Sequence, residues 1–272
     1  MSHRRGRALV LLYLACIALF VITLAGGALA GQAGAADFSR KNLAPCAAFL
    51  FGTDWMGRDM LARTLAGLSL SIRVGALTAA VSAVIALALG TASAVFGGWV
   101  DGLISWAIDL VMGIPHILLI LLISLACGRG FWGVTIGVAL THWPSLARLV
   151  RGEALQLKQA PWLRTARQLG VPHRRLLCDH LIPHLLPQFL TGLILQFPHA
   201  ILHEASVTFL GFGLSPEQPA IGVILEESMG YLTTGRWWLA LFPGLSLVLT
   251  VLLFALLGER LRLLLSPASS QE

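Results

Sequence analysis

Two histidines and a glutamate interrupt the apolar stretch FLTGLILQFPHAILHEASVTFLG at residues 189–211. His199 and His203 are four residues apart, so they share one face if this stretch is helical. Imidazole is a ligand that suits nickel, copper and zinc. Ionisable side chains are expensive to keep within a long apolar stretch and are therefore candidates for function. We predict that His199, His203 and Glu204 line a pathway for a substrate.

Histidines in two other apolar stretches extend this set, because His142 and His116 could face the same pathway. Three interpretations stay open for His199 and His203. They could contact a metal ion transiently, donate to backbone carbonyls at the break that Pro198 introduces, or contact a chelate or peptide. Two histidines are fewer than a closed metal site needs, so no resident metal is predicted.

Three carboxylates in or beside apolar stretches have simpler interpretations. Glu204 also fits a structural role in which it pairs with an arginine near the outer face of the membrane. The candidate arginines are Arg58, Arg63 and Arg73. Asp101 falls in a short turn and is expected to be solvated. Asp109 lies within an apolar run, where snorkelling to water or a neighbouring arginine would satisfy it.

The composition indicates that membrane helices position these residues. Hydrophobic residues make up 57% of the 272 positions and charged residues only 12%, whereas soluble domains carry about 25% charged residues. The 28 glycines and 12 prolines are spread through the apolar runs, as in membrane helices. The net charge of +6 comes from residues between apolar spans rather than on one soluble face. The lipid bilayer is therefore a predicted partner and nucleic acid is not.

The apolar runs predict an all-α polytopic membrane protein with about six transmembrane helices. The runs are 8–30, 70–98, 103–127, 132–150, 189–211 and 237–258. Pro115 is expected to kink the third run. The first run follows a basic start and precedes ALAGQA, so a cleaved signal peptide is an alternative. The run is longer than the apolar part of a usual signal peptide, which favours a retained span.

The chain is predicted to have four parts. Residues 1–30 form an N-terminal anchor helix, 31–66 an extracytoplasmic loop, 67–260 a core of five helices that contains a cytoplasmic segment at 158–188, and 261–272 a cytoplasmic tail. With the N-terminus inside, the inner segments hold 12 of the 19 lysines and arginines. This positive-inside bias places both termini in the cytoplasm.

The segment 158–188 contains the basic stretch RTARQLGVPHRRLLCDHLIPHLLP. Its apolar residues recur at roughly helical spacing, and Gly170-Val171-Pro172 interrupts them. The pattern predicts two helices joined by a turn, with Pro183 and Pro187 closing the second helix. Such an elbow can dock in a groove on a soluble partner. A solvated loop on anionic lipid is the alternative.

The elbow resembles the EAA loop of ABC importer permeases. That pattern reads Glu-Ala-Ala, three residues, glycine, nine residues, isoleucine, one residue and Leu-Pro. Here an arginine replaces the glutamate and a threonine the first alanine, while the glycine and proline spacing holds. The resemblance implies that the elbow docks on an ATP-hydrolysing subunit and transmits its motion. The matching or adjoining residues are Arg164, Thr165, Ala166, Gly170, Val171, Pro172 and Pro183.

Three further motifs resemble the second-permease type of the oligopeptide, dipeptide and nickel importers. FGTDWMGRD at 51–59 is similar to a signature before the second span, and the matching residues are Gly52, Thr53, Asp54, Gly57, Arg58 and Asp59. ILHEASVTFLGFGLSPE at 201–217 resembles a second motif. The stretch 237–262 resembles the closing span, although Glu259 and Leu263 stand where aspartates are usual. The resemblance covers about 50–267.

The resemblance implies a type I ABC importer permease fold in a bacterial cytoplasmic (inner) membrane. The implied partners are a second homologous permease subunit, two ATP-binding subunits and an extracytoplasmic solute-binding protein. The sequence contains no Walker A run, so the chain is not predicted to be an enzyme or to hold a cofactor. ATP would be hydrolysed by the partner subunits.

Nickel or a metallophore complex is the main predicted substrate, and a di- or oligopeptide is the alternative. The histidine at position 203 favours metal, because peptide permeases that resemble this chain often carry a small residue there. Two other classes of protein predict different sequence patterns. A secondary transporter predicts inverted repeats, and a membrane enzyme predicts a convergent catalytic set; neither pattern stands out in the sequence.

Overall fold

The computed structural model describes residues 2–172 and 175–265. Within these ranges the chain is helical, and one isolated bridge joins Thr53 to Asp59. The elements are α1 (Ser2–Ala33), the 3-10 turn η1 (Phe38–Arg40), α2 (Met60–Phe96), α3 (Gly98–Gly113), α4 (His116–Ala126), α5 (Phe131–Lys158), α6 (Pro161–Gln168), the π-helical turn η2 (Leu176–Leu181), α8 (Ile182–Phe209), α9 (Ile221–Leu232) and α10 (Trp238–Leu265). The predicted all-α class is confirmed.

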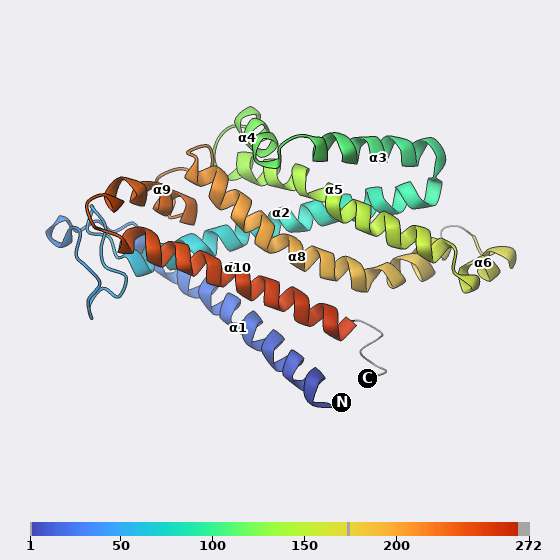
Figure 1. The fold of residues 1–272 in the computed structure, drawn as a ribbon, viewed down its shortest axis with the longest axis horizontal. Helices are drawn as coiled ribbons and strands as arrows, with labels where there is room; N and C mark the ends of the chain where they lie inside the picture. Colours follow the sequence, from blue (N-terminus) through green and yellow to red (C-terminus); the bar gives the residue numbers. More distant parts are fainter. Residues whose placement is uncertain (1, 173–174, 266–272) are drawn as a thin grey trace.

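Three long helices, α2, α5 and α8, run through the centre of an elongated molecule (Figure 1). Helix α2 packs against α1, α5 and α8, while α10 packs against α1 and α8. Helices α3 and α4 lie against α5. The loop before α2 and helix α9 lie at one end of the long axis, and α6 lies at the other (Figure 1). The arrangement therefore separates the signature motif from the elbow.

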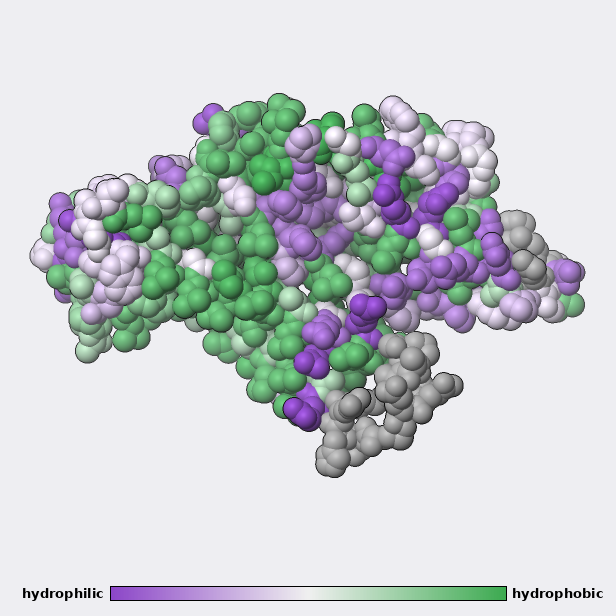
Figure 2. All heavy atoms as spheres, viewed as in Figure 1, coloured by the Kyte–Doolittle hydropathy of each residue, from purple (hydrophilic) through white to green (hydrophobic). Residues whose placement is uncertain are grey.

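Four helices are long and apolar enough to cross a membrane, within Gly6–Ala33, Met60–Phe96, Asp179–Phe209 and Trp238–Leu265. Helices α3 and α4 add a fifth if they form one broken span. Helix α5 covers the fourth predicted run but is less apolar, because it carries His142, Arg148 and Arg151. Apolar residues dominate the middle of the face in Figure 2, polar residues gather near both ends, and a polar area interrupts the apolar band.

The break at Pro115 is sharper than the predicted kink. Helix α3 ends at Gly113, α4 begins at His116, and the two axes meet at 97°. Proline lacks a backbone N–H and disfavours helical backbone in the residue before it, here Ile114. The break matters for the site, because it places His116 at the start of α4, where it lines a cavity together with residues of α5 and α8.

Two elements near the signature motif differ from expectation. Helix α2 begins at Met60, ten residues before the predicted run, because Asp59 caps it by accepting a hydrogen bond of 2.9 Å from the N–H of Leu61. Helix α9 was not predicted, since its 12 residues are too short for a membrane span. It supplies Glu227, which proves central to the packing of the signature motif.

Candidate functional site

A cavity of about 610 Å³ opens where the α3–α4 break faces α5 and α8. Its wall is formed by Val111, Met112, Gly113, Ile114, Pro115, His116, Thr141, His142, Ser145, Gln196, His199 and His203. Among the residues that the structure describes, the wall contains no lysine, arginine, aspartate or glutamate. Four of its residues are the histidines that the sequence singled out, and they come from three different helices.

Three of the four histidines form a close cluster. Each of His116, His142 and His203 offers one ring nitrogen, and these three nitrogens lie within 4.8 Å of one another. The ring centroids are 4.5 Å apart for His116 and His203, and 4.7 Å apart for His116 and His142. His199 lines the same cavity but lies outside this cluster. We call His116, His142 and His203 the histidine trio.

Backbone contacts hold His142 in one orientation. Its Nδ1 lies 2.9 Å from the carbonyl oxygen of Val138, one turn earlier in α5. A carbonyl only accepts, so Nδ1 carries the proton and Nε2 keeps its lone pair. From α8, the Nε2 amide of Gln196 donates to the carbonyl oxygen of His142 over 3.1 Å. The ring is therefore fixed with an unprotonated nitrogen available.

Glu204 does not belong to this cavity, although it follows His203 directly. Its side chain is fully buried, and its Oε1 accepts a hydrogen bond of 3.0 Å from the hydroxyl of Thr208. The same hydroxyl accepts the N–H of Leu214 over 3.2 Å. No ion pair joins Glu204 to an arginine among the described residues. The expected pairing of Glu204 with Arg58, Arg63 or Arg73 is therefore wrong, because two of these arginines serve other carboxylates.

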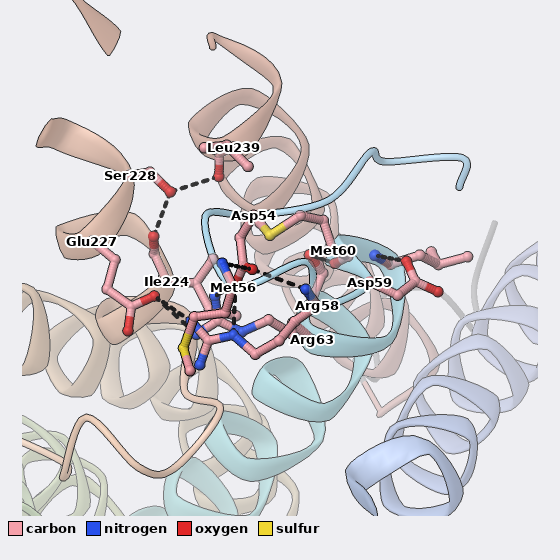
Figure 3. A network of polar contacts seen from close by, with 12 residues as sticks. Asp54, Met56, Arg58, Asp59, Met60, Arg63, Ile224, Glu227, Ser228 and Leu239 are labelled. Atoms are coloured by element: carbon pink, nitrogen blue, oxygen red, sulfur yellow. Dashed lines mark hydrogen bonds and ion pairs between the residues drawn. The ribbon is translucent and has the colours of Figure 1, made fainter. Parts of the chain in front are cut away.

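Those two arginines form a buried network with the signature motif (Figure 3). Asp54 accepts from Nε of Arg58 at 2.6 Å and from Nη1 of Arg63 at 2.7 Å. Glu227 of α9 accepts from Nη2 of Arg58 at 3.2 Å and from Nη2 of Arg63 at 3.0 Å. Each guanidinium thus bridges two carboxylates, and the network ties the loop before α2 to both α2 and α9. Arg73 instead donates to the hydroxyl of Ser69 over 2.8 Å.

The remaining signature residues shape the loop itself. The hydroxyl of Thr53 donates to the carbonyl of Arg40 and accepts the N–H of Leu43 over 2.8 Å. Asp59 caps α2, as described above. Gly57 has a φ of 76°, and a Cβ there would lie 1.8 Å from the carbonyl oxygen of Asp37. Only glycine fits this position, which explains its place in the motif.

Replacing Gly57 by alanine should lower the free energy of unfolding by about 2 kcal/mol or more. The left-handed backbone conformation alone costs about 1–2 kcal/mol for residues other than glycine. In addition, the new Cβ would clash with the backbone carbonyl of Asp37, which cannot rotate away as a side chain could. Gly34→Ala is the matched control, because nothing lies within 4 Å of a Cβ at Gly34. Thermal unfolding of the purified variants in detergent measures the difference. Equal midpoints for the two variants would contradict this account of the loop.

The elbow forms as a helix, a turn and a second helix. After α6, Gly170 adopts a φ of 77°, and the N–H of Val171 donates to the carbonyl of Ala166 over 3.2 Å. This six-residue closure is typical of a helix that ends in a left-handed glycine. The hydroxyl of Thr165 donates back to the carbonyl of Pro161 over 3.0 Å. The side chain of Arg164 lies outside the described part of the chain.

The second half of the elbow does not end at its prolines, contrary to prediction. The turn η2 leads directly into α8, which contains Pro183 in its first turn and then Pro187 and Pro198. Proline is tolerated in the first helical turn, where its missing N–H has no intrahelical partner. The elbow is consequently continuous with a membrane helix.

The elbow is packed onto the helix bundle rather than free of it. Leu163, Leu176 and Leu181 are buried in the same apolar cluster as Val150 of α5 and Ala94 of α2. One exposed residue stands out at the tip, since Leu169 keeps 79% of its surface accessible. A force applied to α6 would therefore reach α2, α5 and α8 through packed side chains.

Two ion pairs join α5 to α3. Arg151 of α5 donates from Nε to Asp101 of α3 at 2.6 Å and from Nη2 to its second oxygen at 2.7 Å. The expectation that Asp101 is simply solvated is therefore wrong, because the turn between α2 and α3 lies against α5. Asp109 pairs with Arg148 at 2.7 Å, as one of its two interpretations proposed.

The sequence of this chain is similar to those of known membrane transport proteins. Residues 83–271 match the family described as binding-protein-dependent transport system inner membrane component. The chain is 29% identical over 231 residues to a dipeptide transport system permease protein of Bacillus subtilis (strain 168), covering 85% of this chain and 72% of that protein. It is 34% identical over 272 residues to a putative peptide transport system permease protein of Brucella abortus biovar 1 (strain 9-941), covering 100% and 90%.

Two further similarities add to these. A glutathione transport system permease protein of Pectobacterium atrosepticum is 34% identical over 231 residues, covering 85% of this chain and 76% of that protein. Among solved structures, the inward-facing MetNI methionine ABC transporter superposes with a TM-score of 0.63 at 17% identity. That match covers 76% of this chain and 98% of the other, and it supports the fold alone.

Proposed function

Because the chain belongs to the binding-protein-dependent transport system inner membrane component family, and is thus a multi-pass inner membrane permease subunit of an ABC importer, we propose that its cargo is a short peptide. The observation that carries this proposal is the set of relatives named for dipeptide, peptide and glutathione transport, at 29–34% identity over most of the chain. Their names favour the peptide alternative over the predicted nickel or metallophore import.

The cavity fits this proposal in size and character. Its volume of about 610 Å³ falls within the range of about 300–1,000 Å³ for small-molecule sites. The wall combines apolar side chains with neutral polar groups such as Thr141, Ser145 and Gln196. A wall whose described residues include no lysine, arginine, aspartate or glutamate suits cargo of varied side chains that must bind and leave again.

The partners follow from the same premise. In this proposal the chain itself has no ATPase site, and two ATP-binding subunits would engage the elbow. A second permease subunit would complete the pathway for the peptide across the membrane. An extracytoplasmic solute-binding protein would deliver the peptide. The signature motif and the elbow lie at opposite ends of the molecule, and the start of α1 and the end of α10 both lie away from the signature motif (Figure 1). This supports a cytoplasmic elbow and cytoplasmic termini.

Deleting this chain should abolish uptake of radiolabelled di- and tripeptides in cells that lack other peptide importers. Restoring the chain together with its partner subunits should restore uptake, because the pathway is incomplete without it. Cell-associated nickel, cobalt and zinc, measured by mass spectrometry in metal-starved cells, should stay unchanged. Unchanged peptide uptake with a selective fall in nickel or cobalt would overturn the peptide proposal and favour metal import.

A further inference from the structure

We propose that His116, His142 and His203 form a three-imidazole site for one divalent transition-metal ion of the nickel, copper and zinc class. The three rings come from α4, α5 and α8, so the site exists only when these helices are assembled. The site would belong to the membrane chain whatever cargo is transported. The metal-site proposal can therefore be tested independently of the peptide proposal.

The first argument is that ring nitrogens of the histidine trio lack hydrogen-bond partners. The Nε2 atoms of His116 and His142 are buried and have no hydrogen-bond partner among the described residues. Buried polar atoms are normally paired, because leaving one unpaired costs free energy. The proton of His142 is held on Nδ1 by the carbonyl of Val138, so its Nε2 presents a lone pair. An unprotonated nitrogen whose partner nitrogen is anchored to a carbonyl is the usual arrangement of a metal-binding histidine.

The second argument is geometric. Ligand nitrogens that each lie about 2 Å from one ion are about 3–4 Å apart, and the trio nitrogens already lie within 4.8 Å of one another. Small rotations of the rings of His116 and His203 would close the remaining gap. Three protein nitrogens also leave a position on a four-coordinate ion for a ligand from the cavity.

The third argument is the chemistry of the surroundings. Imidazole suits nickel, copper and zinc, whereas magnesium and calcium prefer oxygen ligands. Within the described part of the chain, the cavity wall holds no carboxylate that would attract a hard cation and no lysine or arginine that would repel one. The Oε1 atom of Gln196, also part of the wall, is buried without a partner and could accept a hydrogen bond from a water on the ion.

The test uses the chain assembled with its partner subunits in lipid nanodiscs and purified by a tag without histidine. After chelation, Ni²⁺, Zn²⁺ or Co²⁺ is added singly, and the metal retained per complex is measured by mass spectrometry. The triple variant His116→Gln, His142→Gln, His203→Gln should lose one equivalent per copy of this chain. Each single variant should weaken metal binding by about 10-fold or more. Removing a residue that only hydrogen-bonds to a metal ligand already costs about 10-fold in metal affinity, and removing a ligand itself should cost at least as much.

His199→Gln is the matched control, because this histidine lines the same cavity outside the trio. It should retain the metal, and all variants should match the wild type in gel filtration and in metal-free thermal midpoint. Should the triple variant misfold, the visible absorption of Co²⁺ bound to the wild type reports nitrogen coordination without any substitution. Equal metal retention by wild type and triple variant, loss only in His199→Gln, or absence of nitrogen-bound Co²⁺ would each overturn the proposal.

Discussion

Replacing Arg63 by methionine should lower the free energy of unfolding by about 3–5 kcal/mol, the usual cost of breaking a buried ion pair from one side. Arg63 is 2% exposed, and its two Nη atoms reach Asp54 at 2.7 Å and Glu227 at 3.0 Å. Methionine keeps the apolar stem of the side chain but removes both contacts. Asp54 would keep only Arg58 as a cationic partner, and the ion pair from α2 to α9 would be lost, leaving only the pair between Arg58 of the loop and Glu227.

The matched control is Arg40→Met, since Arg40 pairs with Asp37 at 3.0 Å while the two side chains remain 55% and 44% exposed. Exposed pairs contribute about 0–1 kcal/mol, so this variant should unfold close to the wild type. Chemical or thermal unfolding in detergent, with the amount of inserted protein as a second readout, measures both. Arg63→Lys should recover only part of the loss, because one ammonium cannot reproduce a planar fork between two carboxylates. A similar stability for Arg63→Met and Arg40→Met would contradict the role assigned to the network.

Replacing Leu169 by aspartate should abolish stable co-purification of the ATP-binding subunits while leaving the permease folded. Leu169 is 79% exposed at the tip of the elbow, so its replacement removes no contact of the internal core. Within a docked interface, however, a carboxylate without a partner would be costly. We therefore expect the affinity for the ATP-binding subunits to fall about 10-fold or more.

Leu50→Asp is the matched control, because Leu50 is 60% exposed in the loop at the opposite end of the molecule. It introduces the same charge and should leave co-purification with the ATP-binding subunits intact. Both variants should show the wild-type thermal midpoint when purified alone. The docking surface would lie elsewhere if Leu169→Asp retained the ATP-binding subunits as fully as Leu50→Asp.

Local sequence patterns determined much of this architecture. Apolar runs located the helices that could span a membrane, because burial in lipid demands about 20 apolar residues wherever they occur. Gly170 and Pro115 marked real breaks, since left-handed backbone and a missing N–H are properties of single residues. Motif spacing also identified the family. Helix boundaries were less predictable, and Pro183 did not end α8 because it lies in the first turn, which tolerates proline.

The partners of the polar residues were decided only by the tertiary structure. Arg58 pairs with Glu227, 169 positions further along the chain, in a short helix that no membrane-span pattern indicates. Glu204 looked like the partner of an arginine, yet packing placed it beside Thr208. The sequence suggested that His116 and His142 face one pathway with His203, but it could not say that their nitrogens meet within 4.8 Å while His199 stays apart. That distance depends on the 97° break between α3 and α4 and on how α5 packs against α8, and helix packing is a property of whole surfaces rather than of spacing along the chain.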